Sequence, residues 1–151
     1  MTPSVCVDQM LNQRRNHQRP CTGTGNDDRK RGAEPALREA HAAGLGVVIK
    51  EAVANGRLAG PIDDAGLTKH LQPLHDAAVR RGTTPDAIAI AAALAQPWVD
   101  VVLSGAATIA HLESNLTAPA LGWDSSLDRE LESLAMSSAD YWRVRRSFAW
   151  N

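Results

Sequence analysis

The sequence predicts an α/β fold in which short buried strands alternate with helices. Two β-branched runs, residues 47–50 and 99–103, are typical of buried strands, and segments with helical spacing lie before, between and after them. Strands that alternate with helices form right-handed βαβ units around a parallel sheet. We therefore expect two neighbouring parallel strands with helices packed on one side, and a ligand site where the strands end.

The first two helices are predicted from apolar spacing and from the residues that end them. The first begins near Pro35 and ends at Gly44, because glycine easily adopts the left-handed conformation of a helix cap. Turn residues then predict a loop that follows the first strand as far as Pro61. The second helix ends near Gly82 and carries one apolar stripe, formed by Leu67, Leu71, Leu74 and Ala78.

The third helix begins with Thr84, a good helix cap, and with Pro85, which suits a first helical turn. Its Ala/Ile-rich run to Leu94 is apolar nearly all round, so we expect this helix to be buried. Gln96-Pro97 ends it before the second strand, and residues 108–116 again show helical spacing. The predicted order is therefore helix, strand, helices, strand and helix.

Length and composition limit the class of protein. The chain of 151 residues can form one domain with a sizeable core, and its 44% hydrophobic residues are typical of a globular protein. A formal net charge of -1 gives no field that would attract nucleic acid or a membrane surface. We find neither a bilayer span nor a secretory signal. We therefore predict a cytoplasmic protein without nucleic-acid or membrane partners, whose Cys6 and Cys21 are reduced thiols.

Residues 1–34 differ in amino-acid composition from the rest of the chain. They hold few apolar side chains and an excess of arginine and lysine, so they cannot bury enough surface to offset the entropy lost on ordering. No strand precedes Gly23 and Gly25, so a phosphate loop is not favoured there. We expect a disordered or irregular segment over residues 1–34 and a domain over residues 35–151.

Small and hydroxylated residues directly follow the second predicted strand. Ser104, Gly105 and Ala106 form a turn that leads to Thr108, where free N–H groups and the helix dipole favour an anion. Farther along the helix lie His111, Ser114 and Asn115. The pattern fits a phosphate-bearing ligand better than a metal, because it does not supply three or four metal ligands. The alternative is a tight turn in which Thr108 is only a helix cap.

Residues 36–122 closely resemble the C-terminal part of the aldo/keto reductases, the NADP(H)-dependent oxidoreductases built on a (β/α)8 TIM barrel. The stretch AHAAGLGVVIKEAVANGRL is similar to the end of the sixth helix, the seventh strand and its loop. The stretch TTPDAIAIAAALAQPWVDVVLSGAATIAHLESNL is similar to the helix before strand eight, strand eight, and the following loop and helix. The resemblance implies about two βα units of the barrel and NADP(H) as the cofactor.

The resemblance also implies which residues contact the cofactor. Ser104, Gly105, Ala106 and Thr108 lie in the turn that resembles the 2′-phosphate site, and His111 stands where many relatives carry arginine. Ser114 and Asn115 match polar positions that face the adenine. Lys50 stands where other branches place an aromatic ring against the nicotinamide. The loop positions that run along the pyrophosphate in the family match Glu51, Val53 and Asn55 of this sequence. An ordinary ion pair between Lys50 and Glu51 is the alternative.

The family's catalytic tyrosine, lysine, aspartate and histidine lie on earlier strands, and residues 1–34 contain nothing similar. We therefore assign no catalytic residue and no metal ligand. We expect the last third of an enzyme that reduces an aldehyde or ketone, a small-molecule carbonyl substrate, with NADPH. The alternative is a non-catalytic remnant that acts at most as a nucleotide-binding or interaction module. Strands without partners predict self-association through exposed sheet edges.

The closing stretch YWRVRRSFAW resembles the family's C-terminal tail less specifically. In the family this tail closes over the mouth of the barrel, so the resemblance implies that its aromatic rings shape a substrate pocket. Those rings belong to Tyr141, Trp142, Phe148 and Trp150. The alternatives are an aromatic staple that holds the last helix to the core and, less favoured, membrane binding through the arginines.

Overall fold

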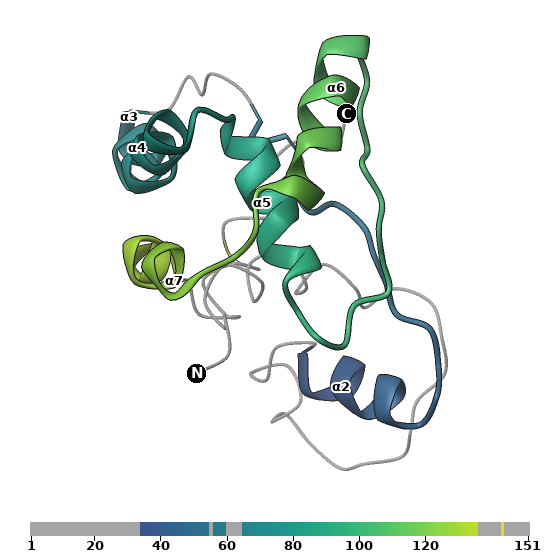
Figure 1. The fold of residues 1–151 in the computed structure, drawn as a ribbon. Coiled ribbons are helices and arrows are strands. Elements are labelled where there is room, and N and C mark those ends of the chain that lie inside the picture. Colours follow the sequence, from purple (N-terminus) through teal and green to yellow (C-terminus); the bar gives the residue numbers. More distant parts are fainter. Residues whose placement is uncertain (1–33, 55, 60–64, 136–142, 144–151) are drawn as a thin grey trace.

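A computed structural model describes residues 34–54, 56–59, 65–135 and 143 (Figure 1). Within these ranges the chain is mixed α/β and mostly helical, with two short parallel strands. The predictions made for residues 1–33, Cys6 and Cys21 included, lie outside the described residues. The same holds for the four aromatic side chains of the C-terminal tail.

The described elements follow one another in nearly the predicted order. They are α2 (Glu34–Ala42), β1 (Val48–Ile49), α3 (Ala65–His70), α4 (Gln72–Arg81), α5 (Pro85–Leu94), β2 (Val101–Val102), α6 (Ile109–Thr117), η1 (Ala118–Ala120), α7 (Ser125–Leu131) and η2 (Glu132–Leu134). Helix α2 includes Glu34, which we had placed in the irregular segment, and Gly44 follows with a left-handed φ of 81°. The bounds of α5 agree with the prediction.

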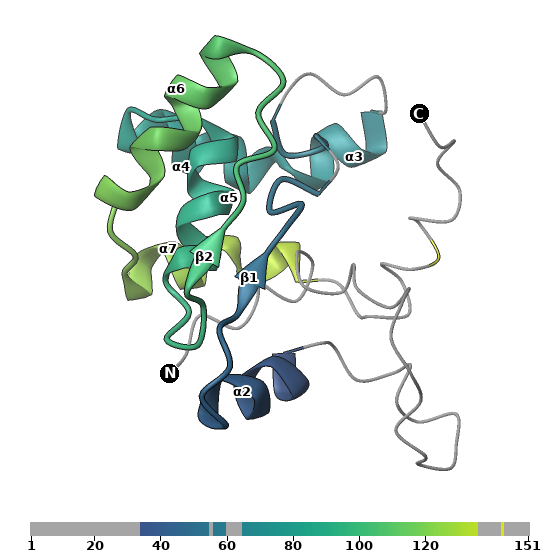
Figure 2. The same ribbon diagram turned by 90° about the vertical axis from the view of Figure 1, so that its right-hand side faces the viewer.

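Strands β1 and β2 lie side by side and run parallel (Figure 2). Val48 pairs with Val101 and Ile49 pairs with Val102, which confirms the predicted pair of neighbouring parallel strands. Helices α4, α5, α6 and α7 lie together on one side of this pair in Figure 2. The predicted placement of helices on one side of the strands is therefore also confirmed.

Both strands are shorter than predicted, because other interactions replace the ladder at their ends. The Asp100 carboxylate accepts a hydrogen bond of 2.6 Å from the Val47 N–H, which takes that donor away from a strand partner. At the other end of β1, Glu51 has a φ of 59°, which turns the chain out of the extended conformation. The paired region is therefore limited to two residues in each strand.

Exposure alternates along the strands, as expected for a sheet that is covered on one face. Val47 and Ile49 are each 3% exposed and belong to the core. Val48 and Val101, which pair with each other on the opposite face, are 43% and 46% exposed. Leu103 lies two residues beyond Val101 and is 48% exposed. The strand pair therefore carries an apolar face that the described residues leave open.

Helix α5 is the centre of the core, as its uniformly apolar sequence predicts. From Asp86 to Ala93 every residue is buried, and the helix packs against α4, α6, η1 and β2. Thr84 caps its start, with Oγ1 accepting a hydrogen bond of 3.4 Å from the Ala87 N–H. Leu74 of α4 is fully buried and belongs to the same core cluster as Ile88.

The prediction of one continuous helix before Gly82 is wrong. The chain forms two helices, α3 and α4, which meet at Leu71. Pro73 lies in the first turn of α4 and has no backbone N–H, so it cannot donate to a carbonyl in the preceding turn. The apolar stripe is nevertheless continuous in effect, since Leu71 and Leu74 are both buried.

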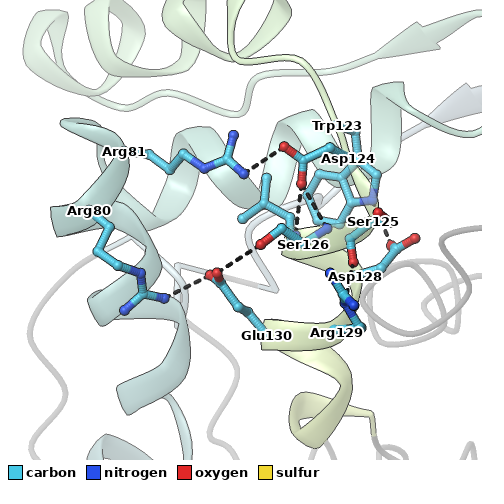
Figure 3. A network of polar contacts seen from close by, with 10 residues as sticks. Arg80, Arg81, Trp123, Asp124, Ser125, Ser126, Asp128, Arg129 and Glu130 are labelled. Atoms are coloured by element: carbon cyan, nitrogen blue, oxygen red, sulfur yellow. Dashed lines mark hydrogen bonds and ion pairs between the residues drawn. The ribbon is translucent and has the colours of Figure 1, made fainter.

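Helix α7 was not predicted from the sequence, and a polar network holds it to α4 (Figure 3). Arg81 donates to the Asp124 carboxylate at 2.7 Å, and Arg80 donates to the Glu130 carboxylate at 2.7 Å. Asp124 also caps α7 by accepting hydrogen bonds from two backbone N–H groups at the start of that helix. Within the described ranges, every helix is too short or too polar to cross a membrane.

These contacts lower the pKa of both carboxyls. The pKa of Asp124 lies below its ordinary value, chiefly because Arg81 donates a hydrogen bond to the ionised form and then because the Leu127 N–H does so. The pKa of Glu130 is lowered chiefly by the hydrogen bond from Arg80, with a smaller contribution from Ser126. The folded chain therefore binds fewer protons at these groups than the unfolded chain near their ordinary pKa values.

The fully buried Leu74 provides a test of the core. We expect Leu74→Ala to lower the free energy of unfolding by about 2–5 kcal/mol, because the cavity left in the core closes only partly. Urea unfolding followed by tryptophan fluorescence measures this change. The control is Val79→Ala on the same helix, where the side chain is 81% exposed and the expected change is within about 0.5 kcal/mol.

The α4–α7 network provides a pH test. Because the pKa of Asp124 is lower in the folded chain, its ionised carboxylate stabilises the fold at pH values above the ordinary pKa of the group. This stabilisation is lost as the pH falls through the lowered pKa. We expect wild type to be more stable than Asp124→Asn at pH 6, and the difference to shrink below pH about 4. Asparagine is also a good helix cap, so the comparison isolates the charge. A constant difference between pH 3 and 6 would contradict this explanation.

The open apolar face provides a test of association. Each strand has one edge without a paired strand among the described residues, and we expect the chain to self-associate as its concentration rises. Val101→Lys should reduce this association, because it places a charge in the middle of the apolar face. Sedimentation velocity over a concentration series measures it, with Val79→Lys on α4 as the matched control. A wild-type chain that stays monomeric throughout would refute the expectation.

Candidate functional site

The parallel pairing brings two loops to the same edge of the sheet. Lys50 directly follows β1, and Leu103 directly follows β2. The Leu103 N–H donates a hydrogen bond of 2.8 Å to the Ile49 carbonyl, so the two chains are still adjacent where the strands end. The two stretches that resemble cofactor-binding loops therefore begin side by side, as the sequence predicts for the carboxyl ends of parallel strands.

An open concavity of about 510 Å³ lies at the turn after β2. Its lining comes from one continuous stretch of chain, formed by Ser104, Gly105, Ala106, Ala107, Thr108, Ile109 and Leu112. Four of the predicted site residues are among them. The concavity is largely open to solvent, so it suits a group that lies against the turn rather than a ligand enclosed on all sides.

The turn itself is held by Asn115. The Asn115 amide Nδ2 donates to the Ser104 carbonyl oxygen at 3.1 Å and to the Ser104 Oγ at 2.8 Å. The Ser104 Oγ in turn accepts a hydrogen bond of 3.2 Å from the Ala106 N–H. Asn115 is only 7% exposed, so it supports the turn from behind and does not itself reach the concavity.

Gly105 provides the bend between the strand and the helix. Its φ of 64° lies in the left-handed region, which a residue with a Cβ adopts at a cost. A Cβ built at this position would meet no atom within 4 Å. The backbone is therefore bare on the side that faces open space, and a ligand can approach the peptide groups there.

The N-terminus of α6 supplies backbone donors. Thr108 is the helix cap, with Oγ1 accepting a hydrogen bond of 3.2 Å from the His111 N–H, as in the plain-cap alternative. Its hydroxyl proton stays available for donation, because the cap uses only the oxygen. The N–H groups of Ile109 and Ala110 have no acceptor within the described part of the chain. These groups and the helix dipole favour an anion at this end of the helix.

Ser114 does not face the concavity. Its Oγ donates to the Asp86 carboxylate, at 2.9 Å from Oδ1 and 2.8 Å from Oδ2, and it also bonds to the Thr84 hydroxyl. Asp86 is 4% exposed and lies in the first turn of α5. Ser114 therefore joins α6 to α5. Sequence reasoning missed Asp86, although an acidic residue that opens a uniformly apolar helix is a signal for it.

The histidine among the candidates, His111, is not part of the lining of the concavity. It is exposed on α6. Lysine and arginine are likewise absent from the lining of this concavity. An anion at the turn would therefore be held by neutral donors, unless it extends along α6 toward His111.

The loop after β1 contributes differently from the turn after β2. Lys50 is exposed, and no ion pair joins it to Glu51 within the described ranges. The Glu51 carbonyl accepts a hydrogen bond of 2.9 Å from the Ala54 N–H, which closes a turn. Val53 packs partly buried against the core. Asn55 lies outside the described residues. None of the loop residues that the structure describes lines the concavity.

The groups with lowered pKa lie on the α4–α7 network, not at the turn after β2. In the described ranges, no group of three or more histidine, cysteine, aspartate or glutamate side chains could hold a metal ion. A search of protein-family models and a search of curated proteins both find no match to this chain. The proposals below therefore rest on the geometry of the turn and on the resemblance of the sequence.

Proposed function

We propose that the turn after β2 binds a phosphorylated adenosine, and that the chain forms the C-terminal part of a (β/α)8 barrel of the aldo/keto reductase type. In this role the turn holds the adenosine 2′-phosphate of NADP(H). The proposal rests on two N–H groups that have no acceptor among the described residues, those of Ile109 and Ala110, at the start of the helix that follows the exposed backbone of Gly105. Such an arrangement favours an anion through its donors and through the helix dipole.

The residues of the turn fit a phosphate group by their donor chemistry. The two free N–H groups and the Thr108 hydroxyl are donors, and phosphate oxygens are strong acceptors. Asn115 keeps the turn in shape through Ser104. The missing cation in the lining limits the affinity, because a charged donor contributes more than a neutral one. His111 is the residue nearest in sequence that can add positive charge.

NADPH, when bound, supplies the hydride that reduces the carbonyl carbon of an aldehyde or ketone. In the proposed arrangement Glu51 and Val53 belong to the loop along the pyrophosphate, and Lys50 stands where other branches place an aromatic ring against the nicotinamide, as the resemblance to the family implies. A general acid must then protonate the carbonyl oxygen within hydrogen-bond reach. The only tyrosine of the sequence is Tyr141, in the tail, so we propose that the acid comes from outside this chain. The proposed NADPH dependence fits a cytoplasmic location.

The second candidate is a nucleotide-binding or interaction module without turnover. The single tyrosine favours it, because the chain alone lacks the catalytic set that the resemblance implies. The two candidates share the phosphate site and differ in chemistry. Binding of the nucleotide without carbonyl-dependent oxidation of NADPH, also after addition of the missing barrel strands as a separate chain, would favour the second.

Calorimetric titration with adenosine 2′-monophosphate and with adenosine tests the phosphate site. We expect wild type to prefer the phosphorylated ligand. His111→Arg should raise the affinity for that ligand by about 1 kcal/mol or more, because it adds a fixed charge on the helix that carries the site. The matched control is His75→Arg on α4, which adds the same charge to a helix that does not line the concavity. Equal binding of both ligands, unaffected by His111→Arg, would contradict the proposal.

A further inference from the structure

We infer that Asp86 is a positioning residue for the phosphate turn, an inference that rests on the function proposed above. Asp86 lies in the first turn of α5 and is 4% exposed. Its carboxylate accepts the hydrogen bond of Ser114 on α6 through both oxygens, at 2.9 and 2.8 Å. A buried carboxylate on the central helix thus holds the helix that carries the proposed site.

The hydrogen bonds around Asp86 have a fixed direction. A carboxylate only accepts, so Ser114 uses its single hydroxyl proton on Asp86. The Thr84 hydroxyl must therefore donate its own proton to the Ser114 Oγ, while Thr84 Oγ1 accepts from the Ala87 N–H. The hydroxyl protons of Thr84 and Ser114 are therefore each donated once along this row of three side chains. The arrangement depends on a carboxylate at position 86, because the amide of asparagine keeps only one of the two acceptor oxygens and adds donors.

The next residue of α6 connects this anchor to the turn. Asn115 directly follows Ser114, and its amide Nδ2 holds the carbonyl oxygen and the Oγ of Ser104. The Ser104 Oγ then holds the Ala106 N–H at the bend. Two successive residues of α6 are thus fixed, one to the core helix and the other to the turn. A change in the rotation of α6 at Ser114 would shift Asn115 and the turn with it.

The sign of the effect separates positioning from simple electrostatics. As a negative charge alone, Asp86 would oppose an anion at the nearby helix start, and its removal would strengthen the binding of a phosphate. As an anchor, its removal loosens the turn and weakens that binding. We expect the second result, because the carboxylate is buried behind Ser114 and points at that hydroxyl rather than at the concavity.

The experiment measures the preference for adenosine 2′-monophosphate over adenosine in Asp86→Asn, Ser114→Ala and the double variant. Circular dichroism first establishes a temperature at which each variant is folded. Each single variant should lose about five- to tenfold of the wild-type preference, the scale of one ordinary hydrogen bond. The double variant should lose no more than either single one, because the two residues act as a unit.

Asp128→Asn is the matched control. Asp128 also lies in the first turn of a helix and accepts a side-chain hydrogen bond, at 2.7 Å from the Trp123 Nε1, but on α7. It should leave the preference unchanged even where it lowers the melting temperature. If Asp86→Asn does not fold, Ser114→Ala and Ser114→Thr replace it, since Ser114 is only partly buried. Only the alanine variant, which lacks the hydroxyl that donates to Asp86, should lose the preference.

The outcomes separate this inference from the function on which it rests. A wild-type chain without any preference for the phosphorylated ligand overturns the phosphate site, and with it the role of Asp86. A wild-type preference that is unchanged or increased in Asp86→Asn overturns the role of Asp86 alone. Additive losses in the double variant would also overturn it, because independent residues do not form one anchor.

Discussion

Helix α5 has no face that can be left in water, and the remaining elements are arranged to cover it. Ile88 and its neighbours are buried on all sides, so α4, α6, η1 and β2 each occupy part of the surface of this helix. Burial of apolar area is the largest favourable contribution to folding, which makes enclosure of α5 the strongest single constraint on the arrangement. The positions of the strand pair and of the turn before α6 follow from this enclosure of α5.

The same enclosure determines where polar interactions can lie. The charged pairs of α4 and α7 are at the surface, where Arg80 and Arg81 reach carboxylates on the neighbouring helix and water screens them (Figure 3). Inside, polar side chains gather at the ends of α5. Gln96 donates to the Ala92 carbonyl at 3.3 Å near one end, and Asp86 binds Ser114 near the other. The polar start of α5 therefore lies against Ser114, the neighbour in sequence of the Asn115 that holds the turn.

Sequence reasoning was most successful where apolar patterns are long or where a cap is distinctive. The bounds of α5 and the cap at Thr108 follow from local residues, and the parallel pairing follows from alternation of strands and helices. It failed where the outcome depends on a tertiary partner. The Asp100 carboxylate shortens the strand pair, and Ser114 turns to Asp86 instead of to a ligand. These contacts join residues far apart in the chain, so local spacing does not predict which partner a polar side chain will bind.

The alanines of α5 set distances as well as covering area. Ala87, Ala89 and Ala92 are each 0% exposed, so neighbouring backbones approach the helix to within the size of a methyl group. A larger side chain at any of them would push a neighbouring element away from α5, and α6 with its turn is one of those neighbours. Such a change is tolerated only when a facing residue becomes smaller. We therefore expect these alanines to vary among relatives in compensating pairs, which ties the shape of the turn to the spacing of the core.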